Sequence, residues 1–123
     1  QAQGATLAIA TSKPDFLAER IARHFGFRDR FTLICGGTAY GPCSTKAGVI
    51  RETLAQLRID DPSQAVMIGD RRFDMEGAVA NSVRGVGVLW GFGDAAELRL
   101  AGATRLVEIP ADLAAAVAAL PDA

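Results

Sequence analysis

Two aspartates that follow an apolar run are the residues of this sequence best suited to chemistry. Residues 65–68 are apolar, Gly69 ends the run, and Asp70 and Asp74 follow it, four positions apart. A buried strand that ends in Gly-Asp places the acid at the open end of a sheet, where α/β folds bind ligands. If the chain turns helical after Asp70, the two carboxylates lie about one turn apart and can share a hard divalent cation such as Mg²⁺. The alternative is structural: Asp70 caps a helix and Asp74 stabilises its first turn.

The two lysines of the chain suggest a second kind of chemistry. Of 13 basic residues only Lys13 and Lys46 are lysines, and a compact ammonium group suits a phosphate oxygen as a point charge. Lys46 is expected in the first turn of a helix, where a cation opposes the helix dipole, so its position favours a function. Lys13 is better explained as a solvated side chain near another helix start.

The elements that must position these residues alternate along the chain. The predicted strands are residues 7–10, 31–35, 65–68, 86–89 and 106–107. Helical patterns separate them, and this alternation predicts βαβ units in a parallel sheet. Residues that directly follow the strands then gather at one edge: Thr11, Ser12 and Lys13 after the first strand, Lys46 beyond the second, and the two aspartates after the third. The sequence therefore predicts a site for a phosphate and Mg²⁺ together.

The helical patterns carry more detailed expectations. The first helix is predicted to have Pro14 in its first turn and Ser12 or Lys13 near its cap. Its buried stripe is expected to consist of Leu17, Ile21 and Phe25. Ser44 or Thr45 is expected to cap the second helix. The third helix is expected to end near Asn81, in the left-handed conformation that this residue tolerates. The strand at residues 65–68 is expected to be covered on both faces.

Composition excludes several classes of protein. The chain has 123 residues, half of them hydrophobic, which is enough for one compact core. Its 13 basic and 14 acidic residues give no electrostatic footprint for nucleic acid or an anionic membrane, and the apolar run at residues 113–120 is too short to span a bilayer. Cys35, Cys43 and the single histidine cannot build a zinc site, so we expect reduced thiols in a cytoplasmic protein.

The order of these motifs resembles a known family. Thr-Ser after a strand, a lysine entering a helix, and Gly-Asp-x-x-x-Asp after a further strand are similar to motifs two, three and four of the haloacid dehalogenase superfamily. The downstream residues resemble its phosphoglycolate phosphatase branch, including 5′-nucleotidase-like relatives. They are Gly77, Ala78, Asn81 and residues 87–91, 97–98 and 101–103. The resemblance implies an α/β fold, a three-layer Rossmann-like core with a parallel sheet. It also implies a Mg²⁺-dependent phosphatase that hydrolyses a small phosphomonoester through an aspartyl-phosphate intermediate.

The resemblance also implies a role for each matching residue. Thr11 matches the hydroxyl that hydrogen-bonds the phosphate, and Ser12 is expected in the same phosphate pocket. Lys46 matches the lysine that neutralises charge on the nucleophile and on the transferring phosphoryl group. Asp70 matches the acid that binds Mg²⁺ directly. Asp74 matches the second acid, which supports the metal shell or orients Lys46.

One part of the family pattern is missing from this sequence. The nucleophile of the family is the first aspartate of an Asp-x-Asp motif, and the 123 residues contain no such motif. Residues 1–123 are therefore interpreted as the C-terminal part of a single hydrolase core domain, without the nucleophile strand and the cap. The absence of an initial Met agrees with a fragment, which alone is expected to be inactive. Its expected partners are the missing N-terminal segment and a small phosphorylated metabolite, and no nucleic acid or membrane.

Three explanations of the missing motif stay open. The chain is part of an ordinary enzyme, or a split protein that another polypeptide completes, or a non-catalytic domain that keeps the fold for binding. The alternative function is accordingly a catalytically silent module that binds phosphate or a protein partner. A nucleotide-binding Rossmann module fits least, because no glycine-rich phosphate turn follows the first strand.

Overall fold

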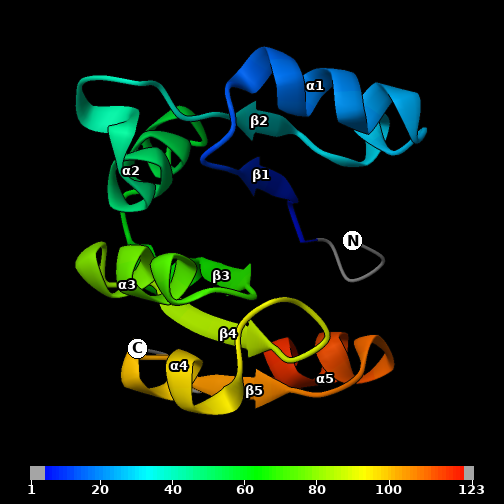
Figure 1. The fold of residues 1–123 in the computed structure, drawn as a ribbon, viewed down its shortest axis with the longest axis vertical. Helices are drawn as coiled ribbons and strands as arrows, with labels where there is room; N and C mark the ends of the chain where they lie inside the picture. Colours follow the sequence, from blue (N-terminus) through cyan, green and yellow to red (C-terminus); the bar gives the residue numbers. More distant parts are fainter. Residues whose placement is uncertain (1–4, 121–123) are drawn as a thin grey trace. The chain divides into compact units, whose positions relative to one another are not determined.

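The computed structural model describes residues 5–120, and the chain divides into two compact units, residues 1–58 and 59–123. Each unit has its own parallel strands and covering helices (Figure 1). This arrangement confirms the predicted α/β class with parallel strands. The prediction that both units belong to one core domain stays a prediction. In the part of the chain that is described, no helix has the length and apolar character needed to cross a membrane.

The first unit contains a pair of parallel strands and two α-helices. Its elements are β1 (Ala8–Ala10), α1 (Asp15–His24), η1 (Arg28–Arg30), β2 (Leu33–Cys35), η2 (Pro42–Ser44) and α2 (Lys46–Gln56). In the strand pair Ile9 lies opposite Ile34, and both pack with Ala18 and Ala22 of α1. The next residue of β2, Cys35, contacts α2 instead. Because successive strand residues point to opposite faces, α1 and α2 cover opposite faces of the pair.

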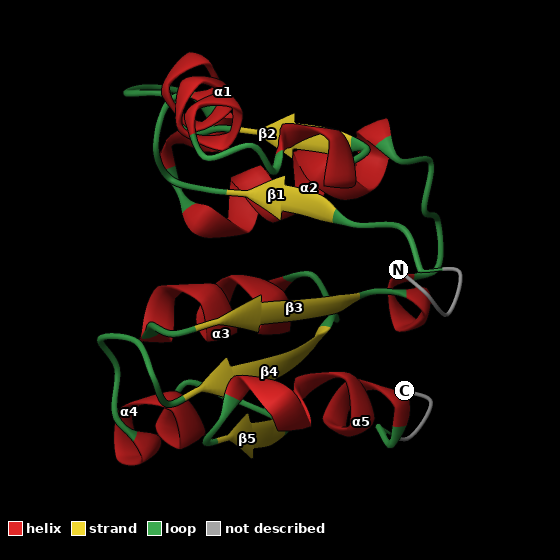
Figure 2. Cartoon of the chain, turned by 90° about the vertical axis from the view of Figure 1, so that its right-hand side faces the viewer, coloured by secondary structure: helices red, strands yellow, loops and turns green. Residues whose placement is uncertain are grey.

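The second unit contains a parallel three-stranded sheet in the order β3-β4-β5. Its elements are η3 (Pro62–Gln64), β3 (Val66–Gly69), α3 (Arg72–Ala80), β4 (Arg84–Val88), α4 (Ala95–Leu100), β5 (Arg105–Val107), η4 (Pro110–Asp112) and α5 (Leu113–Ala118). Two views at right angles show α3 and α4 on one face of this sheet and α5 on the other (Figures 1 and 2). The unit is therefore wound on both sides, as crossover connections between parallel strands require.

The central strand β4 alternates small and branched residues between these two faces. Gly87 lies on the face of α4, where an added Cβ would lie 2.9 Å from Cδ2 of Leu106 and 3.0 Å from Cδ1 of Leu98. On the opposite face Val86 is fully buried against Val107 and the α5 residue Ala116. Glycine on one face thus lets the helix lie close to the sheet, while valine fills the core on the other.

Two expectations about the first helix are wrong. Pro14 is the N-cap residue of α1 and does not lie in its first turn, and no side chain caps the helix. Ser12 and Lys13 directly precede Pro14 and so lie near the cap, as expected. Phe25, expected in the buried stripe, is 72% exposed, and the fully covered residues are Ala18 and Ala22. The stripe is displaced by one position because small alanines let α1 pack closely against its strands. Gly26, with φ of +77°, follows the last turn and ends the helix.

Two expectations about the second unit are also wrong. Asn81 has φ of −104°, and the left-handed residue after α3 is Ser82, with φ of +59°. The Asn81 side chain instead donates a hydrogen bond to the C=O of Gly77, 2.8 Å away, and so satisfies the end of the helix. Ile68 is 41% exposed because β3 is the end strand of its sheet, so β3 is not covered on both faces. The expected cap Thr45 on α2 is confirmed, and Asp94 caps α4.

Candidate active site

The turn between β3 and α3 carries the two aspartates. Asp70 directly follows β3, and Asp74 lies in the first turn of α3. The Oδ2 atom of Asp74 accepts hydrogen bonds from the N–H groups of Asp70, at 3.2 Å, and Arg71, at 3.3 Å. The N-cap residue of α3 is Arg71, so the alternative in which Asp70 caps the helix is wrong. The buried Asp74 is the residue that holds the turn.

A second loop holds Asp70 from the other side. The N–H of Phe92 donates to Oδ2 of Asp70 at 3.0 Å, and the N–H of Gly93 donates to the Asp70 C=O at 2.8 Å. An added Cβ at Gly91 would overlap the Asp70 carboxylate, and one at Gly93 would overlap its C=O. Gly91 and Gly93 therefore allow the backbone of this loop to lie close to Asp70. Asp70 lies half-buried in a position fixed by backbone hydrogen bonds.

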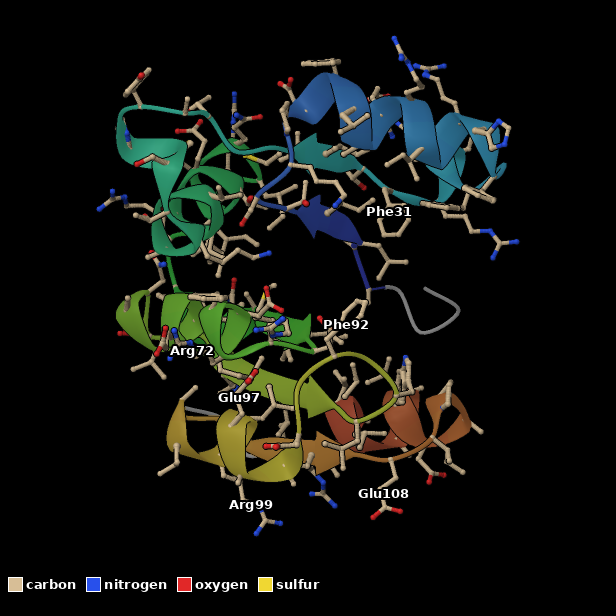
Figure 3. All side chains as sticks on the ribbon, in the orientation of Figure 1. Phe31, Arg72, Phe92, Glu97, Arg99 and Glu108 are labelled. Atoms are coloured by element: carbon tan, nitrogen blue, oxygen red, sulfur yellow. The ribbon has the colours of Figure 1, made fainter. Side chains whose placement is uncertain are left out.

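Glu97 of α4 completes this arrangement, a role that no sequence pattern predicted. Its Oε2 atom accepts a hydrogen bond from the N–H of Arg72 at 2.9 Å and lies 3.4 Å from Nε of Arg71. Figure 3 labels Arg72 and Glu97 on their two helices. The carboxylate thus serves an N–H group at the start of α3 that has no partner within the helix. The two residues are 25 positions apart in the sequence, so no local pattern could predict their contact.

In the first unit, Thr11 organises the turn that follows β1. Its N–H donates to the C=O of Cys35 at 3.0 Å, and its Oγ1 accepts from the N–H of Lys13 at 3.2 Å. The N–H of Gly37 then donates to the C=O of Lys13 at 2.8 Å. Thr11 is half-buried, whereas Ser12 and Lys13 are exposed. The turn therefore has a fixed backbone and presents polar side chains to solvent.

Lys46 is the first residue of α2, as the sequence predicts. Oγ1 of Thr45 accepts the N–H of Gly48 at 3.1 Å and so caps the helix. An added Cβ at Gly48 would overlap the C=O of Pro42, which fixes η2 against the start of α2. Lys46 is half-buried, no acidic residue lies in this first turn, and α2 packs against both β1 and β2. Lys46 thus begins the helix that packs against β1, the strand that Thr11 follows.

The predicted site residues fall into two sets. Thr11, Ser12, Lys13 and Lys46 belong to the first unit, and Asp70 and Asp74 belong to the second. Asp70 and Asp74 share one turn, whereas Lys46 begins α2 and Thr11, Ser12 and Lys13 follow β1. The gathering of these residues at one edge stays a prediction. Within residues 5–120 no three His, Cys, Asp or Glu side chains gather closely enough to hold a metal. Two oxygen donors suit Mg²⁺, which proteins commonly hold through one or two carboxylates together with waters and substrate phosphates.

Cys35 is a core residue. It is buried, and its thiol lies 3.8 Å from the C=O of Val49. Burial raises the pKa of the Cys35 thiol, which keeps it protonated and unreactive near neutral pH. Both cysteines are free thiols, so the prediction of reduced cysteines is confirmed for the described chain.

A parallel α/β fold with acids and a lysine after its strands defines a family. Residues 1–88 match the family of haloacid dehalogenase-like hydrolases, and the chain belongs to that family. The predicted resemblance to this family is thereby confirmed.

Proteins similar in sequence to this chain are named for different activities. The tyrosine-protein kinase PtkA of Mycobacterium tuberculosis is 45% identical over 92 residues, which is 75% of this chain and 31% of that protein. A 5′-nucleotidase of Pseudomonas aeruginosa is 42% identical over 113 residues, 92% of this chain and 49% of the relative. A phosphoglycolate phosphatase of Neisseria meningitidis is 35% identical over 83% of this chain and 43% of the relative. The chain thus spans less than half the length of these relatives, and the last two confirm the predicted branch.

Solved structures agree with this assignment. A predicted phosphatase from Clostridium acetobutylicum superposes with a TM-score of 0.91 at 38% identity. The match covers 97% of this chain and 55% of that one. The fold of the described residues is therefore that of a haloacid dehalogenase-like core, of which this chain makes up part.

Proposed function

We propose that this protein is part of a Mg²⁺-dependent phosphatase that hydrolyses a small phosphomonoester. The observation that carries the proposal is the Asp70 turn. Asp74 fixes it from one side and the Phe92–Gly93 backbone from the other, so that the Asp70 carboxylate is oriented before any ligand arrives. Family membership and the named phosphatase relatives support the same activity.

Each residue has a distinct task in this proposal. Asp70 would hold Mg²⁺, and Asp74 would keep the Asp70 turn in place through its two hydrogen bonds. The bound ion would offset negative charge on the phosphate oxygens. Thr11 and Ser12 would hydrogen-bond the phosphate, and the Lys46 ammonium would balance charge that develops as the phosphoryl group transfers.

The attacking group is not part of this sequence. The 123 residues contain no Asp-x-Asp pair. In the proposed reaction a carboxylate from outside them attacks phosphorus, the alcohol leaves, and water hydrolyses the resulting aspartyl-phosphate. This chain alone should therefore show no phosphatase turnover.

The test uses the complete protein encoded by the gene, assayed on phosphoglycolate, a nucleoside 5′-monophosphate, a sugar phosphate and p-nitrophenyl phosphate. We expect turnover of at least one ester with Mg²⁺ and its loss with EDTA. Asp70→Asn should lower kcat/KM about 100-fold or more, because metal-ion charge stabilisation contributes several kcal/mol. Asp61→Asn is the matched control, since Asp61 is an exposed cap of η3 in the same unit. An Asp70→Asn enzyme with the activity of the control would show that the metal lies elsewhere.

A second candidate is phosphoryl transfer to a protein tyrosine. The 45% identity to a relative named as a tyrosine-protein kinase favours it. The complete protein, incubated with ATP labelled on the γ-phosphate and a tyrosine-containing polypeptide, separates the two reactions. Labelled tyrosine without ester hydrolysis would support the kinase, and hydrolysis without labelled tyrosine would support the phosphatase. A protein without either activity that still binds phosphate would be the catalytically silent module.

A further inference from the structure

The outer edge of β5 is an open strand edge. β5 is the end strand in the order β3-β4-β5, paired on one side with β4. The C=O of Val107 accepts the N–H of Leu89 at 2.9 Å, so the backbone groups of Val107 point toward β4. Because these groups alternate in direction along a strand, those of Leu106 and Glu108 point away from β4. They form a row that can pair with another strand.

The neighbouring helices leave this edge uncovered. An open hollow of about 470 Å³ lies on the α4 side and is lined by Arg99, Thr104 and Arg105. Another of about 560 Å³ lies along α5 and is lined in part by Arg105, Glu108 and Asp112. Space for side chains of an added strand therefore exists on both faces of β5.

Charge along the edge changes sign from its start to its end. Arg105 begins β5, and Arg99 of α4 lines the same hollow as Thr104 and Arg105. Glu108 and Asp112 lie just beyond the end of β5. All four side chains are exposed, and within the described residues none of them takes part in an ion pair. Figure 3 shows Arg99 and Glu108 projecting from the same side of the second unit, separated along β5. A strand of the same sequence complements this edge only when it runs in the opposite direction.

We propose that two copies of this protein pair through the outer edges of β5, antiparallel and about a twofold axis beside Leu106. In this arrangement the Leu106 residues of the copies lie opposite each other and exchange backbone hydrogen bonds. In this register Arg105 of each copy lies opposite Val107 of the other, and its side chain extends toward the end of the other β5, which leads to Asp112 in η4. Glu108 lies opposite Thr104, beside which Arg99 lies. A parallel pair would instead bring arginine to arginine and carboxylate to carboxylate. The edge is thus self-complementary in both hydrogen bonds and charge.

The mass of the complete protein in solution tests this proposal by sedimentation velocity over a range of concentrations and salt. We expect a monomer–dimer equilibrium that weakens as salt rises, because exposed ion pairs are screened. Arg105→Glu should raise the dimer Kd about tenfold, since it replaces an attraction by a repulsion twice in the symmetric interface. The double variant Arg105→Glu/Asp112→Arg exchanges the charges and should restore the original Kd to within about threefold.

Two further variants distinguish a weaker dimer interface from a folding defect. Arg99→Glu and Arg99→Glu/Glu108→Arg repeat the loss and rescue with a different pair. Arg51→Glu is the matched control, because Arg51 is an exposed arginine of α2 in the first unit. A protein that stays monomeric at every concentration would overturn the proposal. This is also the result expected if another segment of the complete protein covers the edge of β5. A dimer that Arg105→Glu weakens no more than the control does, or that neither charge exchange restores, would overturn it as well.

Discussion

At the scale of single residues, Asp74 shows how a carboxylate can serve structure and chemistry together. Its Oδ2 atom binds two backbone N–H groups, and the residue is 8% exposed. The sequence allowed two interpretations of the acids, a metal pair or a helix cap. In the structure Asp74, in the first turn of α3, accepts the backbone N–H groups of Asp70 and of the N-cap residue Arg71. Asp70 is therefore the acid that we propose holds the cation. In the proposed site the two acids therefore have different tasks.

Loss of the Asp74 carboxylate should destabilise the fold. Asp74→Ala leaves two backbone N–H groups at the start of α3 without their acceptor, and we expect a loss of about 1–2 kcal/mol in the free energy of unfolding. Asp74→Asn keeps one acceptor oxygen and should lose less. Urea titration followed by circular dichroism measures both. Glu76→Ala, at an exposed position of the same helix, is the control. Equal losses for Asp74→Ala and the control would contradict the capping role.

The two thiols should differ in reactivity. Cys35 is buried and its pKa is raised, whereas Cys43 is half-exposed in η2. Since the thiolate is the reactive form, iodoacetamide at about pH 8 should label Cys43 in the folded protein and leave Cys35 unmodified. Peptide mass spectrometry locates the label, and denaturant should expose both thiols. Labelling of Cys35 at the rate of Cys43 without denaturant would show that the core of the first unit opens readily.

At the scale of elements, close approaches of backbone to backbone fix the site loops. At the end of β2, an added Cβ on Gly36 would overlap the N and Cα atoms of Asp15 at the start of α1. The turn that contains Thr11 is therefore held against the end of β2, and its geometry depends on a residue without a side chain.

Gly36→Ala should accordingly be strongly destabilising. The backbone of α1 has to move to make room, and we expect a cost of about 2 kcal/mol or more in unfolding free energy. Gly26→Ala is the informative comparison: it has open space around it but a φ of +77°, so its cost, about 1 kcal/mol, comes from backbone conformation alone. Thermal and urea unfolding of both variants provides the measurement. A smaller loss for Gly36→Ala than for Gly26→Ala would contradict the close packing.

Sequence patterns predicted these elements well where the signal is local. Apolar runs located all five strands, and the cap residue Thr45 located the start of α2. Patterns failed where tertiary packing decides. In α1 the buried residues are Ala18 and Ala22, whereas Phe25 is exposed. Ile68 is exposed because β3 lies at the end of its sheet.

At the scale of the whole molecule, local patterns predicted which elements carry the candidate residues, and the assembly of these residues into one site stays a prediction. Thr11, Lys46 and Asp70 each follow a strand or begin a helix, and their order along the chain carries the family resemblance. Glu97 could not be found in this way. Its partner, the N–H of Arg72, belongs to a different helix, and the contact exists only once α3 and α4 cover the same face of the sheet.

Stability of the molecule should depend on pH through Glu19. Its carboxylate accepts hydrogen bonds from Arg28, and from Arg23 at 3.3 Å. The hydrogen bond from Arg28, more than any other influence, lowers the pKa of Glu19 below its ordinary value. Because the folded pKa lies below the unfolded one, this contribution to stability is present above the unfolded pKa and is lost as pH falls through the folded pKa.

The variant Glu19→Gln should therefore have a lower Tm than the parent at neutral pH, and the difference should shrink at an acidic pH below the ordinary pKa of glutamate. Circular dichroism melts at both pH values measure it. Asp29→Asn, at an exposed position of η1, is the control. A Tm difference that persists unchanged in acid would mean that Glu19 stabilises the first unit by packing and not by its charge.

Within residues 5–120, each strand pairs with a strand adjacent to it in sequence, β1 with β2 and β3 with β4 and then β5. During synthesis on the ribosome, a strand of either sheet therefore finds its partner already outside the exit tunnel or arriving next. The second unit can add β4 to β3, and then β5 to β4, in the order of translation, without waiting for a distant segment. Vectorial synthesis and sheet assembly thus proceed in the same direction, which shortens the time during which apolar strands are exposed to other nascent chains.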